Sequence, residues 1–158
     1  NTKQLFLSKK IIIRGIAKKL SAQFDDNSFG VLVAVHTAIP KKPEYNSFYL
    51  LALINSSLFN WYHLTKFYTA RFPMGSLKYP ISFLKQLPIK SIPSREQKPF
   101  IDLVGKILVI TRDEDYLESI AKQTKAKEHE RQIDQMVYEL YGLTKEEIEI
   151  VEGHSKED

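Results

Sequence analysis

Runs of β-branched and other apolar residues, separated by turn formers, characterise the first 40 positions. Residues 11–13 are three consecutive isoleucines, and residues 29–39 are rich in valine. β-Branched side chains favour strands, whereas Gly15 suits a bend and residues 25–28 form a cluster typical of turns. Pro40 would end the second run, because proline cannot donate a hydrogen bond to a ladder. This part of the chain therefore predicts antiparallel strands joined by tight turns.

From residue 47 the apolar positions follow helical spacing. They fall at 50, 51, 54, 58, 61, 62 and 64, and Asn46 or Ser47 could cap the start of the helix. The polar triplet at 55–57 predicts a break into two helical pieces, at which Asn55 could satisfy backbone groups. Residues 69–76 contain a proline and a glycine and predict a loop. Prolines within and next to residues 77–92 predict short strands near a sheet edge, where proline is tolerated.

The last third of the chain is helical in pattern. Helices are predicted over residues 94–112, 115–141 and 145–151. Ser94, followed by Glu96 and Gln97, resembles a capping box, and Thr144 with Glu147 forms a second one.

A stripe of apolar side chains marks the buried face expected at the end of the middle helix. Its members are Ile133, Met136, Val137, Leu140 and Tyr141. Gly142 follows and would end the helix. Together the patterns predict an α+β fold, with a small, mostly antiparallel sheet, packed helices and a helical C-terminal region.

Charge divides the chain into two parts, although the formal net charge is only +4. Residues 1–112 carry 17 Lys and Arg against 5 Asp and Glu, whereas residues 113–158 carry 6 against 14. We interpret residues 1–112 as a target-recognition domain that meets a polyanion and residues 113–158 as a helical anchoring region. The alternative interpretation is that these charged faces are simply solvated.

The sequence contains no motif for catalysis. Its six glycines form no Gly-x-Gly pair, its four histidines lie far apart, and it has no cysteine. The densest acids, Glu147, Glu149 and Glu152, fall on a predicted solvated helix. We therefore expect no catalytic, cofactor-binding or metal-binding residue here. The absence of cysteine suits the cytoplasm, and the longest apolar stretch, residues 48–59, is too short and polar to span a membrane.

Basic residues in and beside the predicted strands and loops indicate phosphate contacts. The candidate DNA-binding residues are Lys9, Lys10, Arg14, Lys18, Lys41, Lys42, Lys66, Arg71 and Lys78. Arg71 could read guanine through a bidentate pair. The aromatic residues Tyr68, Phe72 and Tyr79 beside it could stack on bases or belong to the core.

Five segments, taken in order, resemble the TaqI-like C-terminal specificity domain. They are residues 9–14 (KKIIIR), 49–60 (YLLALINSSLFN), 83–89 (FLKQLPI), 96–104 (EQKPFIDLV) and 132–144 (QIDQMVYELYGLT). The residues in these segments are mostly those of a scaffold. We therefore expect base contacts from the turn at residues 41–42 and the loop at residues 66–78.

The resemblance implies the C-terminal part of a type IIG-like restriction-modification enzyme, related to the type I specificity subunits. Such an enzyme carries an S-adenosylmethionine-dependent adenine methyltransferase domain and often a Mg²⁺-dependent nuclease domain. The expected partners are thus double-stranded DNA and the methyltransferase and nuclease domains of the same polypeptide, with no membrane. A protein-interaction module with a solvated basic face, and a nuclease with an unfamiliar site, are the alternatives.

Overall fold

The structure, a computed structural model, describes residues 7–26, 35–67 and 75–155, except for the side chains of residues 154 and 155. Its strands form two small antiparallel sheets, a three-stranded sheet in the order β3-β1-β4 and a two-stranded sheet of β2 and β5. The strands are β1 (Lys10–Arg14), β2 (Ile16–Ala17), β3 (Ala22–Asp25), β4 (Val35–Ala38) and β5 (Leu77–Lys78).

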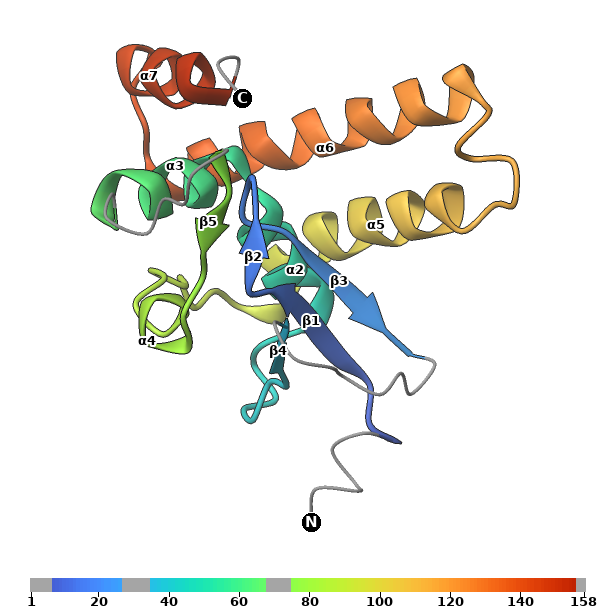
Figure 1. Cartoon of the computed structure of the whole chain (residues 1–158), viewed down its shortest axis with the longest axis horizontal. Helices are drawn as coiled ribbons and strands as arrows, with labels where there is room; N and C mark the ends of the chain where they lie inside the picture. Colours follow the sequence, from blue (N-terminus) through green and yellow to red (C-terminus); the bar gives the residue numbers. More distant parts are fainter. Residues whose placement is uncertain (1–6, 27–34, 68–74, 156–158) are drawn as a thin grey trace.

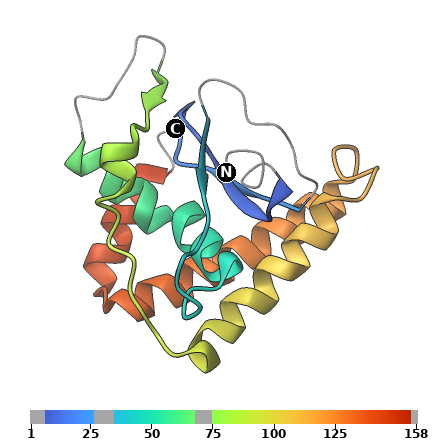
Figure 2. The same ribbon diagram turned by 90° about the horizontal axis from the view of Figure 1, so that it is seen from below.

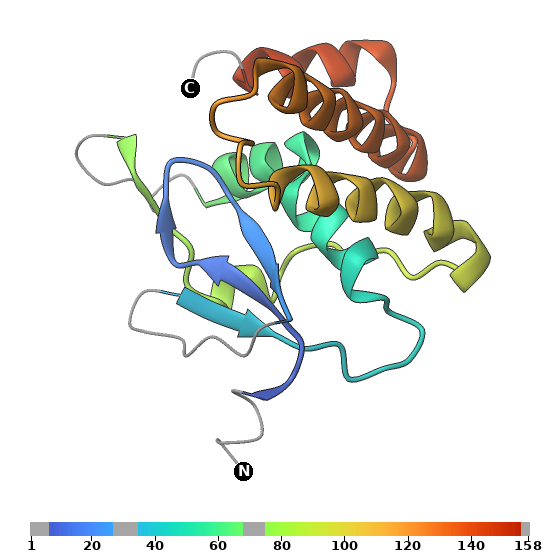
Figure 3. The ribbon, with the colours of Figure 1, turned by 90° about the vertical axis from the view of Figure 1, so that its right-hand side faces the viewer.

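Six helices accompany these strands in the part of the chain that the structure describes. They are α2 (Ser47–Asn55), α3 (Ser57–Lys66), α4 (Ile81–Leu84), α5 (Ser94–Thr111), α6 (Ile120–Tyr141) and α7 (Lys145–Ser155). Helix α2 lies between the three-stranded sheet and the hairpin of α5 and α6 (Figures 1 and 3). Helices α5 and α6 run side by side, and α7 packs on α3 (Figure 2). The predicted α+β fold with a helical C-terminal region is confirmed.

The isoleucine run forms the central strand, as predicted. Ile11 and Ile13 are buried, whereas Ile12 and Arg14 lie on the opposite face, as the two-residue period of a strand requires. The chain bends at Gly15, and β2 leaves this sheet to pair with β5. The expected second strand, residues 29–39, is described only from Val35 onward. The predicted turn at residues 25–28 is likewise described only in part.

The helix break at residues 55–57 is also confirmed. Ser56 ends α2 and caps α3, because its hydroxyl accepts a hydrogen bond from the Phe59 N–H at 3.3 Å. At the other end of α2, the Asn46 side chain accepts from the Phe48 N–H at 2.8 Å. Two consecutive helices thus share one capping residue between them.

The two polar residues on either side of Ser56 connect this break to distant elements. The Asn55 amide accepts from the Ala22 N–H at 2.7 Å and donates to the Ala22 carbonyl at 2.9 Å, so it pairs with β3 as a neighbouring strand would. The Ser57 N–H and hydroxyl donate to the two oxygens of Asp134 on α6, at 2.8 and 2.7 Å. The break therefore fixes the sheet and the C-terminal helices against α2 and α3.

The prediction of short strands over residues 77–92 is largely wrong. Only Leu77 and Lys78 form a strand, Ile81–Leu84 is a short helix, and residues 85–93 are neither helix nor strand. The segment is held instead by tyrosine hydroxyls from two helices. Tyr141 donates to the Pro88 carbonyl at 2.5 Å and accepts from the Lys90 N–H at 3.1 Å, and Tyr49 donates to the Lys90 carbonyl at 2.7 Å.

The start of α5 also differs from the prediction. Its capping position is Pro93, and no side chain caps the helix there, so the capping box expected at Ser94 is wrong. Gln97 is buried, and its amide bonds to the Glu44 and Ile92 carbonyls and to the Asn46 N–H. This side chain therefore ties the turn before α2 to the start of α5, a role that depends on tertiary packing.

The remaining helix ends follow local rules. Helix α6 begins at Ile120, capped by Ser119, rather than at residue 115 as predicted. Gly142 ends it with a φ of 70°, and Thr144 and Glu147 form the predicted capping box before α7. Among the described residues, no helix is long and apolar enough to cross a bilayer.

Asp134→Ala is expected to lower the free energy of unfolding by about 1–2 kcal/mol, because it leaves two donors at the start of α3 without their acceptor. Urea denaturation followed by circular dichroism measures the change. Asp102→Ala is the matched control, since it removes only an exposed pair with Lys98 and should cost less than about 0.5 kcal/mol. A loss for Asp134→Ala no larger than that of the control would contradict the expectation.

Candidate nucleic-acid interface

Three basic side chains gather where β1, β2 and β3 meet. Arg14 ends β1, and Lys18 and Lys19 form the turn between β2 and β3; all three are exposed. They line an open hollow of about 560 Å³ together with Ile12, Gln23 and Val35 of the three-stranded sheet. We call this group and the hollow beside it the basic tip. It combines cationic side chains with a concave surface, which suits a polyanionic ligand.

The pairing of β2 with β5 extends the basic tip. Lys78 lies opposite Ile16 in the two-stranded sheet and is exposed. Lys66 ends α3 and is also exposed, but its ammonium contacts the Tyr62 hydroxyl at 2.7 Å and lies 5.1 Å from that ring's centre. Arg71, Tyr68 and Phe72 lie outside the described residues. Of the two ends of the predicted loop, Lys78 lies in the two-stranded sheet and Lys66 lies at the end of α3.

Lys41 and Lys42 lie away from the basic tip. They precede the N-terminal end of α2, whereas Asn55, at its C-terminal end, bonds to Ala22 next to the tip. Nine helical residues span about 13 Å, which separates the two basic regions. Lys42 also lies 3.7 Å from Glu44. Lys9 is exposed and precedes β1 at the end of the sheet nearer to these two lysines.

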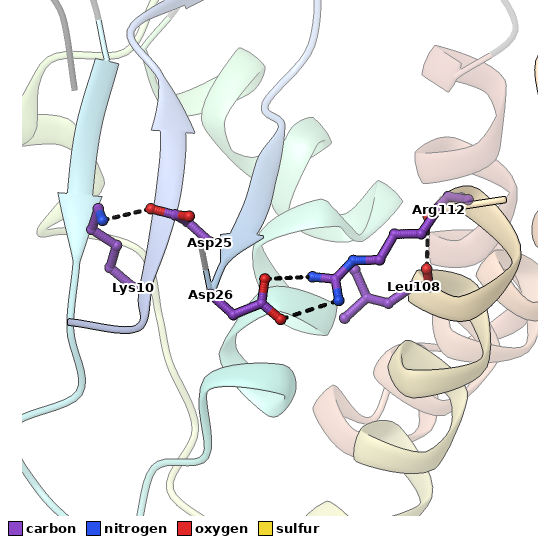
Figure 4. Close-up of polar contacts among 6 residues, drawn as sticks. Lys10, Asp25, Asp26, Leu108 and Arg112 are labelled. Atoms are coloured by element: carbon purple, nitrogen blue, oxygen red, sulfur yellow. Dashed lines mark hydrogen bonds and ion pairs between the residues drawn. The ribbon is translucent and has the colours of Figure 1, made fainter. Parts of the chain in front are cut away.

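Lys10 is not exposed, which corrects its assignment as a DNA-contacting residue. Its side chain is 1% exposed, and its ammonium lies 2.5 Å from the fully buried carboxylate of Asp25 (Figure 4). The two residues are partners in the register of β1 and β3. Lys10 therefore has a structural role, because the buried carboxylate of Asp25 requires a compensating cation.

The next residue, Asp26, binds the helical hairpin. Its carboxylate accepts two hydrogen bonds from the Arg112 guanidinium, at 3.0 and 3.1 Å, while the Arg112 N–H donates to the Leu108 carbonyl at the end of α5 (Figure 4). Consecutive aspartates thus connect β3 to β1 on one side and to α5 on the other. Both carboxylates have cationic partners, so neither offsets the positive charge of Arg14 and Lys18.

A second hollow, of about 520 Å³, separates β3 from α5 and α6. Its rim carries Glu130 and Asp134, and burial raises the pKa of both carboxyl groups, with Lys19 acting in the opposite direction. Lys19 therefore lies between the two hollows and near these acids. Carboxylates repel phosphates, which makes the hollow at the basic tip the better candidate for nucleic acid.

A buried histidine packs beneath the ends of the segment between α3 and β5. His63 is 0% exposed, and its ring lies 4.4 Å from the ring of Tyr79 and 5.1 Å from that of Phe67, centre to centre. Among the described residues, neither ring nitrogen has a hydrogen-bond partner. Burial lowers the pKa of His63 from 6.5 to about 4, so the ring is neutral at pH 7. The sequence showed only an isolated histidine on a helix.

Tyr79 is itself buried, so it packs in the core and is not available to stack on bases.

Within the described residues, no cluster of three or more potential metal-ligating side chains of His, Cys, Asp and Glu is found. Glu147, the first of the acids considered for catalysis, accepts a hydrogen bond from the Thr144 N–H at 2.8 Å and so caps α7.

Comparison with known proteins identifies one matching family model. The model of the TaqI-like C-terminal specificity domain matches residues 1–89, more than half of the chain. The match includes the three strands of the larger sheet, α2, α3 and the basic tip. The resemblance noted at residues 96–104 and 132–144 lies outside the matched residues and stays a prediction. A comparison with curated proteins gives no significant match.

Lys10→Met is expected to destabilise the fold by about 3–5 kcal/mol, because it leaves the Asp25 carboxylate buried without the cation that pairs with it. Urea denaturation measures the difference. The matched control is Lys9→Met, which alters the neighbouring, exposed lysine and should change stability by less than about 0.5 kcal/mol. Equal stabilities of the two variants would show that the ion pair is not required.

His63 should make stability depend on pH. Since its pKa is lowered in the fold, the unfolded chain takes up the proton first, and stability present above pH 6.5 is lost as the pH falls toward 4. The loss between pH 7 and pH 4.5 should be roughly 2–3 kcal/mol. His63→Phe should remove this component in urea titrations at both pH values. An unchanged pH dependence in the variant would refute the assignment.

Proposed function

The chain belongs to the TaqI-like C-terminal specificity domain family, a family of specificity domains of restriction-modification enzymes, and we propose that it binds duplex DNA and selects the sequence on which such an enzyme acts. The observation that carries the proposal is the basic tip. Arg14 and Lys18 are exposed beside a hollow, while the acids at the far end of β3, Asp25 and Asp26, are bound to Lys10 and Arg112.

We further propose that the two parts of the chain have different roles. Residues 1–112 contain the basic tip and would contact DNA. Residues 113–158 are acidic, their helices α6 and α7 pack on α5 and α3, and we propose that they attach the domain to its partners. Three exposed apolar side chains at the far end of the α5–α6 hairpin support this second role: Val109, Leu117 and Ile120 are 70%, 83% and 80% exposed. They are the observation that favours protein contacts for this part of the molecule.

The reaction served by this recognition would belong to other parts of the enzyme. We propose that a methyltransferase domain flips out and methylates an adenine in the selected site, using S-adenosylmethionine, and that any cleavage uses Mg²⁺ in a nuclease domain. In this scheme the present chain supplies position and sequence preference. Its residues bind and orient DNA and take no part in bond making.

Binding to a duplex of mixed sequence is expected to weaken steeply as salt rises from 50 to 200 mM, because each phosphate that is neutralised releases counterions. Fluorescence anisotropy of a labelled duplex measures this. The variant Arg14→Glu/Lys18→Glu should lose at least about 10-fold in affinity at 50 mM salt, with a log–log salt slope smaller by about two.

The matched control reverses two exposed lysines on the helical hairpin, Lys106→Glu/Lys127→Glu. It introduces the same change in net charge, so a general charge effect would weaken both variants equally. Specific loss in the Arg14 and Lys18 variant supports the basic tip. If the unmodified chain does not bind DNA at 50 mM salt, or if its affinity does not change with salt concentration, the proposal is wrong. Either result would favour a protein-interaction module.

A further inference from the structure

We propose that the outer face of the three-stranded sheet, rather than a loop, reads the base edges of duplex DNA in the major groove. The inference rests on the proposed function, DNA binding, and adds to it the surface and the residues that would contact the bases. We define the outer face as the side chains that point away from α2 next to the basic tip. They are Ile12, Arg14, Gln23, Val35 and Thr37.

The strand register places these side chains together. Ile12 is paired with Gln23 on β3 and with Thr37 on β4, and Arg14 is paired with Val35. Directly paired residues lie on the same face of a sheet. Ile11 and Ile13, the alternate residues of β1, are buried in the core, so this row must face outward. Gln23, Thr37 and Arg14 are exposed, as a reading surface requires.

The chemistry of this face matches base edges better than it matches phosphates alone. A glutamine amide can bond to the N6 and N7 atoms of adenine, and an arginine can bond to the O6 and N7 atoms of guanine. Ile12 and the methyl group of Thr37 offer apolar contact to a thymine methyl group. Among the described residues, no side-chain hydrogen bond or ion pair occupies Gln23, Thr37 or Arg14.

The dimensions also agree. Neighbouring strands lie about 4.8 Å apart, so the two outer strands of this sheet are separated by about 10 Å. The major groove of B-DNA is about 12 Å wide and admits a two-stranded β-ribbon, so two neighbouring strands of this face would enter the groove and the third would lie at its edge. With the face in the groove, Lys18 and Lys19 lie at the rim of the same hollow, where they can reach phosphates.

The two ends of the outer face differ in charge. At the basic tip, the exposed Arg14 and Lys18 attract DNA phosphates. At the opposite end, Lys10 and Asp25 share the side of the sheet that carries Ile12, but they are buried and paired with each other, so the exposed face ends before them. The regions expected from sequence to read bases are less suited where they are described. Lys42 lies near Glu44, and Lys66 bonds to Tyr62.

The experiment selects preferred sites from a library of randomised duplexes, using the full 158-residue chain and its variants at 50 mM salt. Gln23→Ala and Thr37→Ala should each relax the base preference at one position of the selected site, by roughly 5- to 100-fold. Affinity for duplexes of unrelated sequence should change by less than about twofold, since phosphate contacts remain. Lys18→Ala should instead weaken all duplexes alike.

The matched controls are Gln135→Ala and Thr124→Ala, which remove the same side chains from exposed positions on α6 and should leave the selected site unchanged. If Gln23→Ala and Thr37→Ala also leave it unchanged, or if the unmodified chain selects no sequence, the outer face does not read bases. Salt-dependent DNA binding would survive that result, so the two proposals can fail separately. Equally tight, Gln23-dependent binding of duplex RNA would also overturn the inference, because the deep, narrow major groove of RNA excludes such a sheet.

Discussion

The helix break at residues 55–57 is the constraint on which the rest of the molecule depends. Ser56 ends α2 and caps α3, Asn55 pairs with the backbone of Ala22 on β3, and Ser57 binds Asp134 on α6. These three residues therefore connect the sheet, the helices α2 and α3, and α6 of the C-terminal helical region. The partly buried Asp134 carboxylate would be costly without its two donors, which favours this placement of α6, and the two bonds from Asn55 align the start of β3 with the end of α2.

The position of the basic tip follows from this arrangement. Asn55 fixes the start of β3, and the preceding turn carries Lys18 and Lys19 outward. At the other end of β3, Asp25 and Asp26 bind Lys10 and Arg112. Asp25 and Asp26 are thus paired with cations inside the molecule, whereas Arg14, Lys18 and Lys19 at the other end of the sheet stay exposed. Charge separation of this kind produces a local positive field even though the net charge of the chain is small.

Elements whose signals are local were predicted well. The isoleucine strand, the break at Ser56, the glycine end of α6 and the capping box at Thr144 all depend on residues within a few positions of each other. The failures involve partners far along the chain. Residues 85–93 are held by Tyr49 and Tyr141 instead of by a ladder, and Gln97 bonds to the turn before α2 instead of capping α5. No local pattern reports such contacts.

The sequence by itself determined the fold class, most helix boundaries and the family resemblance, which the match to residues 1–89 confirms. It also located the basic residues along the chain. Only the tertiary structure decided which of them share a surface: Arg14, Lys18 and Lys19 meet at one tip, Lys41 and Lys42 lie beyond α2, and Lys10 is buried against Asp25. The reason is that strand register and helix packing, rather than residue type, fix which side of the molecule a side chain faces.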